Sequence, residues 1–248
     1  MNNNILTTDE QRRYARNILL PQVGLVGQDK LRNARMLVVG AGGLGAASLG
    51  YLAAAGVGKI GIMDNDFVEL SNLNRQIIHE TGDIGRLKVQ SAADRISEIN
   101  PHVELQLYAQ RLHDDNAHII ADYDIVIDGC DNFATRYVIN KACLAAKIPW
   151  IYGAAQGFKG QIAVFHSDAN SPCYRCFVPT EPHQRNDCEH RGVLGAVVGI
   201  IGAMQSMEAI KLIVGINIAT TKIIRYDGVQ NIWKSAILHK DLGCVDCQ

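Results

Sequence analysis

Most features that mark a nucleic-acid binder or a disordered chain are missing from this sequence. Its 24 Lys and Arg residues are balanced by 25 Asp and Glu residues, for a formal net charge of -1. It therefore lacks the basic surface that neutralises nucleic-acid phosphates. It also lacks any run of five like charges, any low-complexity linker and any internal repeat. A chain of 248 residues with this composition is expected to fold as one globular domain over residues 1–248.

Signals for export and for membrane insertion are missing as well. Residues 1–16 contain no basic segment followed by an apolar one, so we expect no export. Residues 36–58 form an uncharged window long enough to cross a bilayer, but its seven glycines suit a strand, a turn and a helix better. A second uncharged stretch, residues 192–207, is short for a membrane span. We expect a cytoplasmic protein that does not enter membranes.

Apolar runs separated by turn signals predict an α/β fold of the Rossmann type. Residues 36–40 predict a buried strand, residues 46–56 a helix closed by Gly56, and residues 59–64 a second strand. This strand–helix–strand unit predicts a mostly parallel sheet with covering helices.

Later segments continue the same plan and divide the domain into two parts. A nucleotide-binding half is expected over about 13–154, and a C-terminal part with antiparallel strands over about 155–248. Residues 171–191 are rich in Pro, Cys, His and charge, and predict an irregular loop. Further strands are predicted over 103–110, 123–128, 149–154, 222–226 and 230–238, a hairpin over 157–166, and helices over 84–99, 133–147 and 193–214.

A glycine-rich turn follows the first predicted strand. Gly40, Gly42 and Gly45 satisfy G-x-G-x-x-G, in which the glycines permit a tight turn, close approach of backbone to phosphate and close helix packing. The helix N-terminus then presents free N–H groups to an anion. Asp64 ends the next strand, where a carboxylate can accept hydrogen bonds from ribose hydroxyls. These features predict a nucleotide site but do not specify the nucleotide.

The side chains that would neutralise a triphosphate must come from elsewhere, because no G-x-x-x-x-G-K-[ST] motif occurs. Arg75 or Lys88 alone is expected to be a solvated surface charge. Several polar residues, however, follow predicted strands, and ligands bind at the carboxyl ends of parallel strands. These candidates are Asp64, Asp66, Asn72, Arg75, Lys88, Asp131 and Asn132.

Seven cysteines in a chain without an export signal favour metal binding or reactive thiols over disulfides. Four of them form two C-x-x-C pairs, Cys173 with Cys176 and Cys244 with Cys247. Two such pairs complete a tetrahedral sulfur site that suits structural zinc. A redox dithiol and an iron–sulfur cluster are the alternatives. A zinc here would tie the loop near Cys173 to the residues around Cys244, which would otherwise fray.

The order of these motifs resembles the MoeB/ThiF family, the bacterial relatives of ubiquitin-activating enzymes. The resemblance rests on G-x-G-G-L-G, D-x-D, S-N-L-x-R-Q, G-x-x-K, C-D-N and the two C-x-x-C pairs, from about Arg13 to Cys247. Ala196 departs from it, because a proline commonly stands there in the family.

The resemblance implies an ATP-dependent adenylyltransferase. Its substrate would be the C-terminal glycine of a ubiquitin-like sulfur carrier, ThiS-like or MoaD-like, that ends in Gly-Gly and serves thiamine or molybdopterin synthesis. The turn would lie under the phosphates, and Asp64 would hold the ribose. Asn72, Arg75 and Lys88 would contact the triphosphate, and Asp131 would bind Mg²⁺. The ATP site implied by the matching positions comprises Gly40, Gly42, Gly43, Gly45, Asp64, Asp66, Ser71, Asn72, Arg75, Lys88, Asp131 and Asn132.

Two further residues take roles from the resemblance. Arg16 matches an arginine that family members lend across a dimer interface, which predicts a homodimer. Cys188 matches a cysteine that receives the activated carrier or its sulfur, and Arg185 and Arg191 nearby would lower its pKa. The alternative for Cys188 is a spectator thiol. No rhodanese-like segment follows Cys247, so a separate sulfur donor, a cysteine desulfurase or a rhodanese, is expected.

Three other functions are the alternatives to this adenylyltransferase. An NAD-dependent oxidoreductase would use the same glycine turn, but it needs a hydride-handling His or Tyr-Lys pair that we do not find. A zinc-stabilised nucleotide-binding scaffold would have no use for converging phosphate contacts. A related enzyme that activates tRNA or a peptide is a third alternative.

Overall fold

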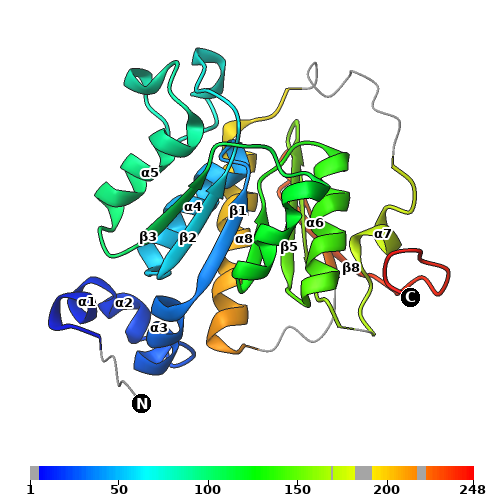
Figure 1. Cartoon of the computed structure of the whole chain (residues 1–248), viewed down its shortest axis with the longest axis horizontal. Helices are drawn as coiled ribbons and strands as arrows, with labels where there is room; N and C mark the ends of the chain where they lie inside the picture. The colour runs from blue at the N-terminus through cyan, green and yellow to red at the C-terminus, as the bar shows by residue number, and fades with distance from the viewer. Residues whose placement is uncertain (1–5, 169, 182–191, 217–221) are drawn as a thin grey trace.

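The computed structural model describes residues 6–168, 170–181, 192–216 and 222–248. Its centre is one sheet with the strand order β3-β2-β1-β4-β5-β6-β7-β8 (Figure 1). The first five strands in this order pair in parallel and the last three pair antiparallel, which confirms the predicted fold class. The strands are β1 Arg35–Val39, β2 Lys59–Met63, β3 Glu104–Tyr108, β4 Ile125–Asp128, β5 Trp150–Gln156, β6 Lys159–Phe165, β7 Lys222–Asp227 and β8 Ile232–Ile237.

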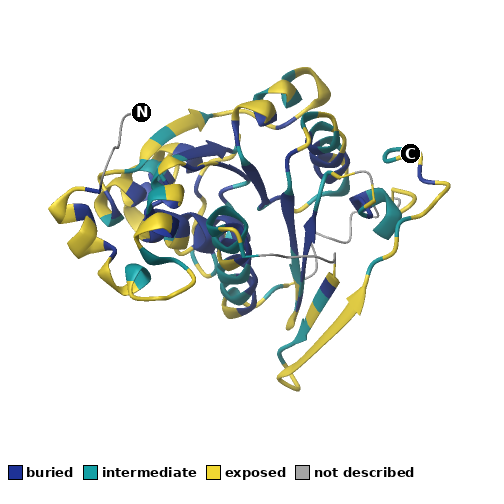
Figure 2. Cartoon of the chain, turned by 90° about the horizontal axis from the view of Figure 1, so that it is seen from below, coloured by how far each residue is buried: buried dark blue, intermediate teal, exposed yellow. Residues whose placement is uncertain are grey.

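Helices cover both faces of the parallel part. Successive residues of a strand point to opposite faces: Met36 and Val38 of β1 pack with helices α4, α5 and α8, whereas Leu37 and Val39 pack with α6. The main helices are α3 Gly24–Asn33, α4 Gly43–Ala55, α5 Lys88–Ile99, α6 Phe133–Ala146 and α8 Gly195–Val214. Because both faces are covered, the central strands are dark blue in Figure 2.

Short helices complete the described chain. The N-terminal helices were not predicted, although Thr7 and Glu10 form a capping box at the start of α1 and T-x-x-E is its sequence signature. Glu10 also pairs with Arg32 of α3 at 3.2 Å, which ties the first turn to the domain. The short elements are α1 Thr8–Arg13, α2 Ala15–Ile18, α7 Tyr174–Phe177, η1 Leu70–Asn72, η2 Thr81–Asp83 and η3 Asp114–Asp122.

The helix predicted over 84–99 begins four residues later, at Lys88. The preceding residues pair with the loop after β2 instead: the amide of Val68 donates to Arg86 O, and that of Gly85 donates to Val68 O, both at 2.9 Å. These tertiary hydrogen bonds satisfy backbone groups that a helix would otherwise have used. The predicted end before Asn100 and Pro101 is confirmed, since α5 ends at Ile99.

The helix predicted over 46–56 begins earlier than expected, at Gly43, so the last three residues of the glycine turn lie in the first helical turn. It ends before Gly56, whose φ of +83° is the left-handed cap predicted for that glycine. Within the predicted loop 171–191, residues 174–177 form α7, and residues 182–191 lie outside the described residues.

The long helix α8 is apolar and long enough, by length and composition alone, to cross a membrane. It lies against the sheet and α4, with residues such as Val198, Ile201 and Ala209 buried in the core. This packing explains its composition as that of a core helix. By contrast, β8 is exposed along its whole length at the far edge of the sheet (Figure 2).

Candidate active site

A cleft of about 1410 Å³ lies at the carboxyl ends of the parallel strands. It extends from the glycine turn after β1 to the antiparallel strands β6, β7 and β8. The structure brings to this cleft eleven of the residues predicted for the ATP site: Gly40, Gly42, Gly43, Asp64, Asp66, Ser71, Asn72, Arg75, Lys88, Asp131 and Asn132.

The glycines of the turn meet three different steric demands. Gly40 has φ +98°, and a Cβ there would lie 2.6 Å from Gly129 O. A Cβ on Gly45 would lie 1.9 Å from Gly40 O, so α4 can pack on the turn only if Gly45 has no side chain. A Cβ on Gly42 would have nothing closer than 3.8 Å. Gly42 therefore keeps the cleft side of the turn open, as needed for close approach of a phosphate.

Asp64 holds the loop that follows β2. One carboxylate oxygen accepts from the amide of Ala41 at 2.7 Å, and the other accepts from the amide of Asp66 at 2.8 Å. Each carboxylate oxygen has a further lone pair. Asp64 thus joins the glycine turn to the end of β2 and still has acceptor capacity toward the cleft.

Lys88 is a nearly buried cation at the start of α5. Its ammonium donates to Asp66 Oδ2 at 2.9 Å, and its side chain is only 7% exposed. Its backbone amide donates to Asp66 O at 2.9 Å. The backbone contact holds the start of α5, and the ion pair holds the ammonium at the cleft wall. An anion that binds there meets a cation with little hydration to lose.

Arg75 follows the 3₁₀ helix η1. Its guanidinium donates from Nη1 to Ser71 O at 2.8 Å and to Asn74 Oδ1 at 3.2 Å. The guanidinium has five N–H donors in all, so these contacts orient it and leave donors for a phosphate. Asn72, buried beside it, accepts from the amide of Glu69 and caps η1.

Asp131 is exposed in the cleft just after β4. Its neighbour Asn132 accepts from the amide of Thr135 at 2.9 Å and thereby caps α6. Beneath them, Asp128 and Arg136 form a buried ion pair at 2.8 Å. An exposed carboxylate shortly after a strand suits a magnesium ion, which binds through one or two carboxylates and keeps several waters.

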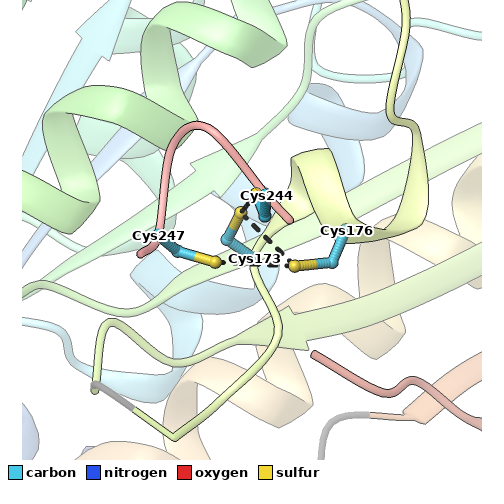
Figure 3. A group of neighbouring side chains, drawn as sticks. All are labelled: Cys173, Cys176, Cys244 and Cys247. Atoms are coloured by element: carbon cyan, nitrogen blue, oxygen red, sulfur yellow. Dashed lines mark hydrogen bonds between the residues drawn. The ribbon is translucent and has the colours of Figure 1, made fainter. Parts of the chain in front are cut away.

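The four cysteines predicted to bind metal lie together (Figure 3), and their Sγ atoms are all within 4.8 Å of one another. The contacts are 3.9 Å for Cys173–Cys176, 3.6 Å for Cys173–Cys244 and 3.5 Å for Cys176–Cys247. A tetrahedral site with Zn–S of about 2.3 Å places sulfurs roughly 3.8 Å apart. The donor set and its spacing fit zinc.

Groups around the cluster hold its two halves in place. Asn140 of α6 donates to Cys173 Sγ at 3.7 Å and to Asp246 Oδ2 at 2.9 Å. Arg175 pairs with Asp246 at 2.8 Å. The loop around Cys173 and the C-terminal segment are thus joined by outer hydrogen bonds as well as by the thiols, as is usual around metal ligands.

Three predicted site residues do not line the cleft in the described structure: Gly45, which packs inside the turn, Arg16 and Cys188. Arg16 is exposed on α2 and is not among the cleft residues. Cys188 lies outside the described residues. The structure also adds two residues to which no role was assigned: Gln76, the last residue of the S-N-L-x-R-Q motif, lines the cleft, and His79 lies behind the glycine turn. His79 follows the motif by three residues, which was the available signal.

The comparison with protein families agrees with this geometry. The model of the ThiF family matches residues 14–245, nearly the whole chain. The chain belongs to the ThiF family. The resemblance to MoeB/ThiF proteins is thereby confirmed, and an oxidoreductase with the same turn loses its support.

Curated relatives of this ThiF chain carry adenylyltransferase names. "Adenylyltransferase and sulfurtransferase MOCS3" of Culex quinquefasciatus is 44% identical over 98% of the chain, and "Probable adenylyltransferase/sulfurtransferase MoeZ" of Mycobacterium tuberculosis is 43% identical over 95%. "Probable molybdopterin-synthase adenylyltransferase" of Porphyra purpurea is 44% identical over 93%. The chain spans 56% of the first relative's length and 62% of each of the other two.

Solved structures share the fold of this ThiF chain. Escherichia coli MccB with MccA-N7isoASN superposes with a TM-score of 0.85 at 22% identity, covering 98% of this chain and 75% of that one. PaaA superposes with a TM-score of 0.80 at 23% identity, covering 96% of this chain and 76% of that one. At these identities the likeness establishes the fold alone.

Proposed function

We propose that this protein is an ATP-dependent adenylyltransferase that activates the C-terminal glycine carboxylate of a ubiquitin-like sulfur carrier. One observation carries the proposal: a single cleft joins the open glycine turn, the nearly buried Lys88 and the oriented Arg75. The adenylyltransferase names of the relatives support the same reaction.

In the proposed reaction a carrier carboxylate oxygen attacks the α-phosphorus of ATP. The bond from that phosphorus to the bridging oxygen breaks, and its electrons leave with pyrophosphate. The products are a carrier acyl-adenylate and pyrophosphate. Because both reactants are anionic, positioning and charge neutralisation supply most of the acceleration.

The residues of the cleft divide this work. The N–H groups at the start of α4 face the phosphates, Asp64 holds the ribose, and Arg75 and Lys88 neutralise the triphosphate. Asp131 would hold the Mg²⁺ ion, which would screen the phosphate oxygens. Four neighbours position these groups: Asp66 pairs with Lys88, the Ser71 carbonyl accepts from Arg75, Asn72 caps the preceding helix η1, and Asn132 donates to Asp131 Oδ1 at 3.4 Å.

The carrier tail is proposed to enter over the antiparallel strands. The cleft continues from the turn to these strands, where Lys159, Arg225 and Lys234 line it. Arg225 of β7 and Lys234 of β8 lie directly opposite each other in the ladder. Asp227, opposite Lys159 in the ladder, also lines this part of the cleft, so the three cations leave a net positive floor. Such a floor suits an extended peptide that ends in a carboxylate.

The name of the Porphyra purpurea relative favours a molybdopterin-type, MoaD-like carrier over a thiamine-type, ThiS-like one. We further propose a cytoplasmic homodimer in which Arg16 of one subunit completes the phosphate site of the other. Cys188 would receive the activated carrier or its sulfur, and a cysteine desulfurase or a rhodanese would donate that sulfur.

The decisive experiment is ATP–pyrophosphate exchange with purified molybdopterin-type and thiamine-type carriers, each ending in Gly-Gly and tested separately. We expect exchange with the molybdopterin-type carrier and none with a carrier truncated by its last two residues. Exchange with the thiamine-type carrier alone would reverse the pathway assignment. Exchange with neither would overturn the proposed substrate and favour a tRNA or peptide substrate.

The same preparations test Cys188. The Cys188→Ser variant should retain exchange and lose thiocarboxylate formation when the sulfur donor is present. A variant that still forms the thiocarboxylate would exclude the covalent step.

A further inference from the structure

His79 is a buried titratable residue that the proposed reaction leaves without a role. It is 6% exposed and lies between the glycine turn and α5. Its Nε2 lies 3.1 Å from Ala41 O, and its Nδ1 lies 2.7 Å from Ser91 Oγ. Ser91 Oγ in turn donates to Asp83 Oδ2 at 2.7 Å. A continuous series of hydrogen-bonding groups therefore runs from the turn to a carboxylate.

The number of protons available along this series restricts the protonation state of the His79 imidazole. The Ala41 carbonyl and an ionised Asp83 can only accept, and a serine hydroxyl has one proton to give. When Ser91 donates to Asp83, His79 has to supply the proton of the Nδ1 contact as well as that of the Nε2 contact. A neutral ring with one N–H leaves one of the three contacts without a proton, whereas an imidazolium satisfies all three.

The contact with Ala41 determines where a cleft-facing amide points. The carbonyl of Ala41 and the N–H of Gly42 belong to one planar trans peptide, so they point in opposite directions. The carbonyl is directed inward at His79, and Gly42 lines the cleft. The preceding N–H, that of Ala41, is held by Asp64 at 2.7 Å. The carbonyl of the Ala41–Gly42 peptide is thus held by His79, and the N–H of the peptide before it is held by Asp64.

We propose that His79 is a positioning residue for the nucleotide: its Nε2–H holds the Ala41 carbonyl and so aims the Gly42 N–H at a phosphate oxygen. This inference rests on the proposed nucleotide site and adds a residue that the motifs do not assign. His79 touches neither phosphate nor carrier, so it acts only through the turn. A preorganised N–H loses no reorganisation energy when the anion arrives.

The charged groups around His79 set the direction of its pH dependence. Burial holds the pKa of His79 below its ordinary value and Lys88 of α5 lowers it further, while the Ala41 contact, Asp83 and Asp64 oppose this. For Asp83, burial opposes ionisation, but hydrogen bonds from Ser91, the Glu80 amide and Arg86 hold its pKa below the ordinary value.

Asp83 is therefore ionised near neutral pH and accepts the Ser91 proton. All three hydrogen bonds of the series then form only when His79 is protonated. A bound phosphate also favours the imidazolium. By linkage, nucleotide affinity that depends on His79 rises as the pH falls through the pKa of that ring.

The test compares His79→Gln with His79→Leu. The Gln amide can still donate to the Ala41 carbonyl, but it does not titrate, and Leu offers no donor. ATP dissociation constants are measured by calorimetry between pH 5.5 and 8 for the wild type and both variants, and thermal unfolding checks that each is folded. The titration of ATP itself is common to all three proteins and cancels in their ratios.

We expect His79→Leu to weaken ATP binding about tenfold, the size of one lost buried hydrogen bond, and His79→Gln to lose far less. The affinity ratio of wild type to His79→Gln should rise as the pH falls. Unchanged binding in a folded His79→Leu variant would overturn the proposal, and so would an equal loss in a folded His79→Gln variant.

A second measurement needs no substitution. The ¹⁵N shifts of the His79 ring in the wild type report which nitrogens carry protons. A protonated Nε2 supports the proposal, and a neutral ring protonated only at Nδ1 overturns it. If the wild type does not bind ATP, the proposed function fails, and the Nε2 protonation state still decides this inference.

Discussion

At the residue scale, two glycines of the same helix illustrate the difference between a required and a tolerated glycine. A Cβ at Gly45 would collide with Gly40 O at 1.9 Å, and this carbonyl belongs to the backbone of the turn and cannot rotate away. A Cβ at Gly50, five residues further along α4, would have nothing within 4 Å. The glycine-turn motif covers the first position and not the second.

We therefore expect Gly45→Ala to destabilise the protein by about 1–3 kcal/mol, the range for overpacking, and to weaken ATP binding because the turn must move. Gly50→Ala is the matched control. It should be neutral or stabilise the helix by up to about 1 kcal/mol, because alanine is the better helix former. Urea unfolding and ATP titration of both variants measure these effects. Equal stability of the two variants would contradict the assigned role of Gly45.

At the element scale, the cysteine cluster connects segments that are far apart in the sequence. Helix α7 contributes Cys176 and follows directly on Cys173, and the segment with Cys244 and Cys247 comes from beyond β8. Beyond the thiols, the ion pair between Arg175 and Asp246 joins the two segments. A bound zinc would therefore add to an arrangement that the outer contacts already favour.

We expect the purified protein to contain one zinc per chain and Cys244→Ser to lose it. Stripping the metal with a strong chelator should lower the melting temperature and make the residues after β8 sensitive to protease, because the C-terminal segment loses its anchor. Cys143→Ser, which changes a buried thiol outside the cluster, should keep its zinc. Metal analysis and limited proteolysis decide the outcome, and a Cys244→Ser variant that retains full zinc would exclude the site.

At the scale of the whole molecule, Arg16 does not line the cleft of its own chain. Arg16 is exposed on α2 and is followed by the exposed apolar residues Leu19 and Leu20, which are 71% and 52% exposed. Exposed apolar residues beside an exposed arginine are what a subunit interface would cover. This arrangement supports the proposal that Arg16 acts on the cleft of a second copy.

Complementation between subunits tests that arrangement. Arg16→Ala and Arg75→Ala should each nearly abolish carrier-dependent pyrophosphate exchange. When the two variants are mixed and allowed to exchange subunits, roughly a quarter of the wild-type activity should return, because half the dimers are mixed and each mixed dimer holds one intact site. Arg95→Ala, an exposed arginine paired with Glu98, is the control and should be fully active. No recovery in a dimeric mixture would place Arg16 outside the neighbouring site.

Much of the fold follows from local patterns. The left-handed cap at Gly56 and the stop at Asn100 and Pro101 are short-range effects, and both appear as predicted. The start of α5 at Lys88 was mispredicted, because residues 84–87 make hydrogen bonds to a loop that is distant in sequence. Local propensity carries no information about such a partner.

The candidate site shows the same contrast between local sequence signals and contacts between distant segments. The glycines, the Arg75 and Lys88 cations and the two cysteine pairs are evident from residue identity and spacing, because their chemistry is a property of the residues and their order. The burial of Lys88 against Asp66 and the contact of His79 with the carbonyl of Ala41 are evident only in the folded chain. Burial and hydrogen-bond partners depend on which segments the sheet brings together, and the order of residues along a chain does not contain those distances.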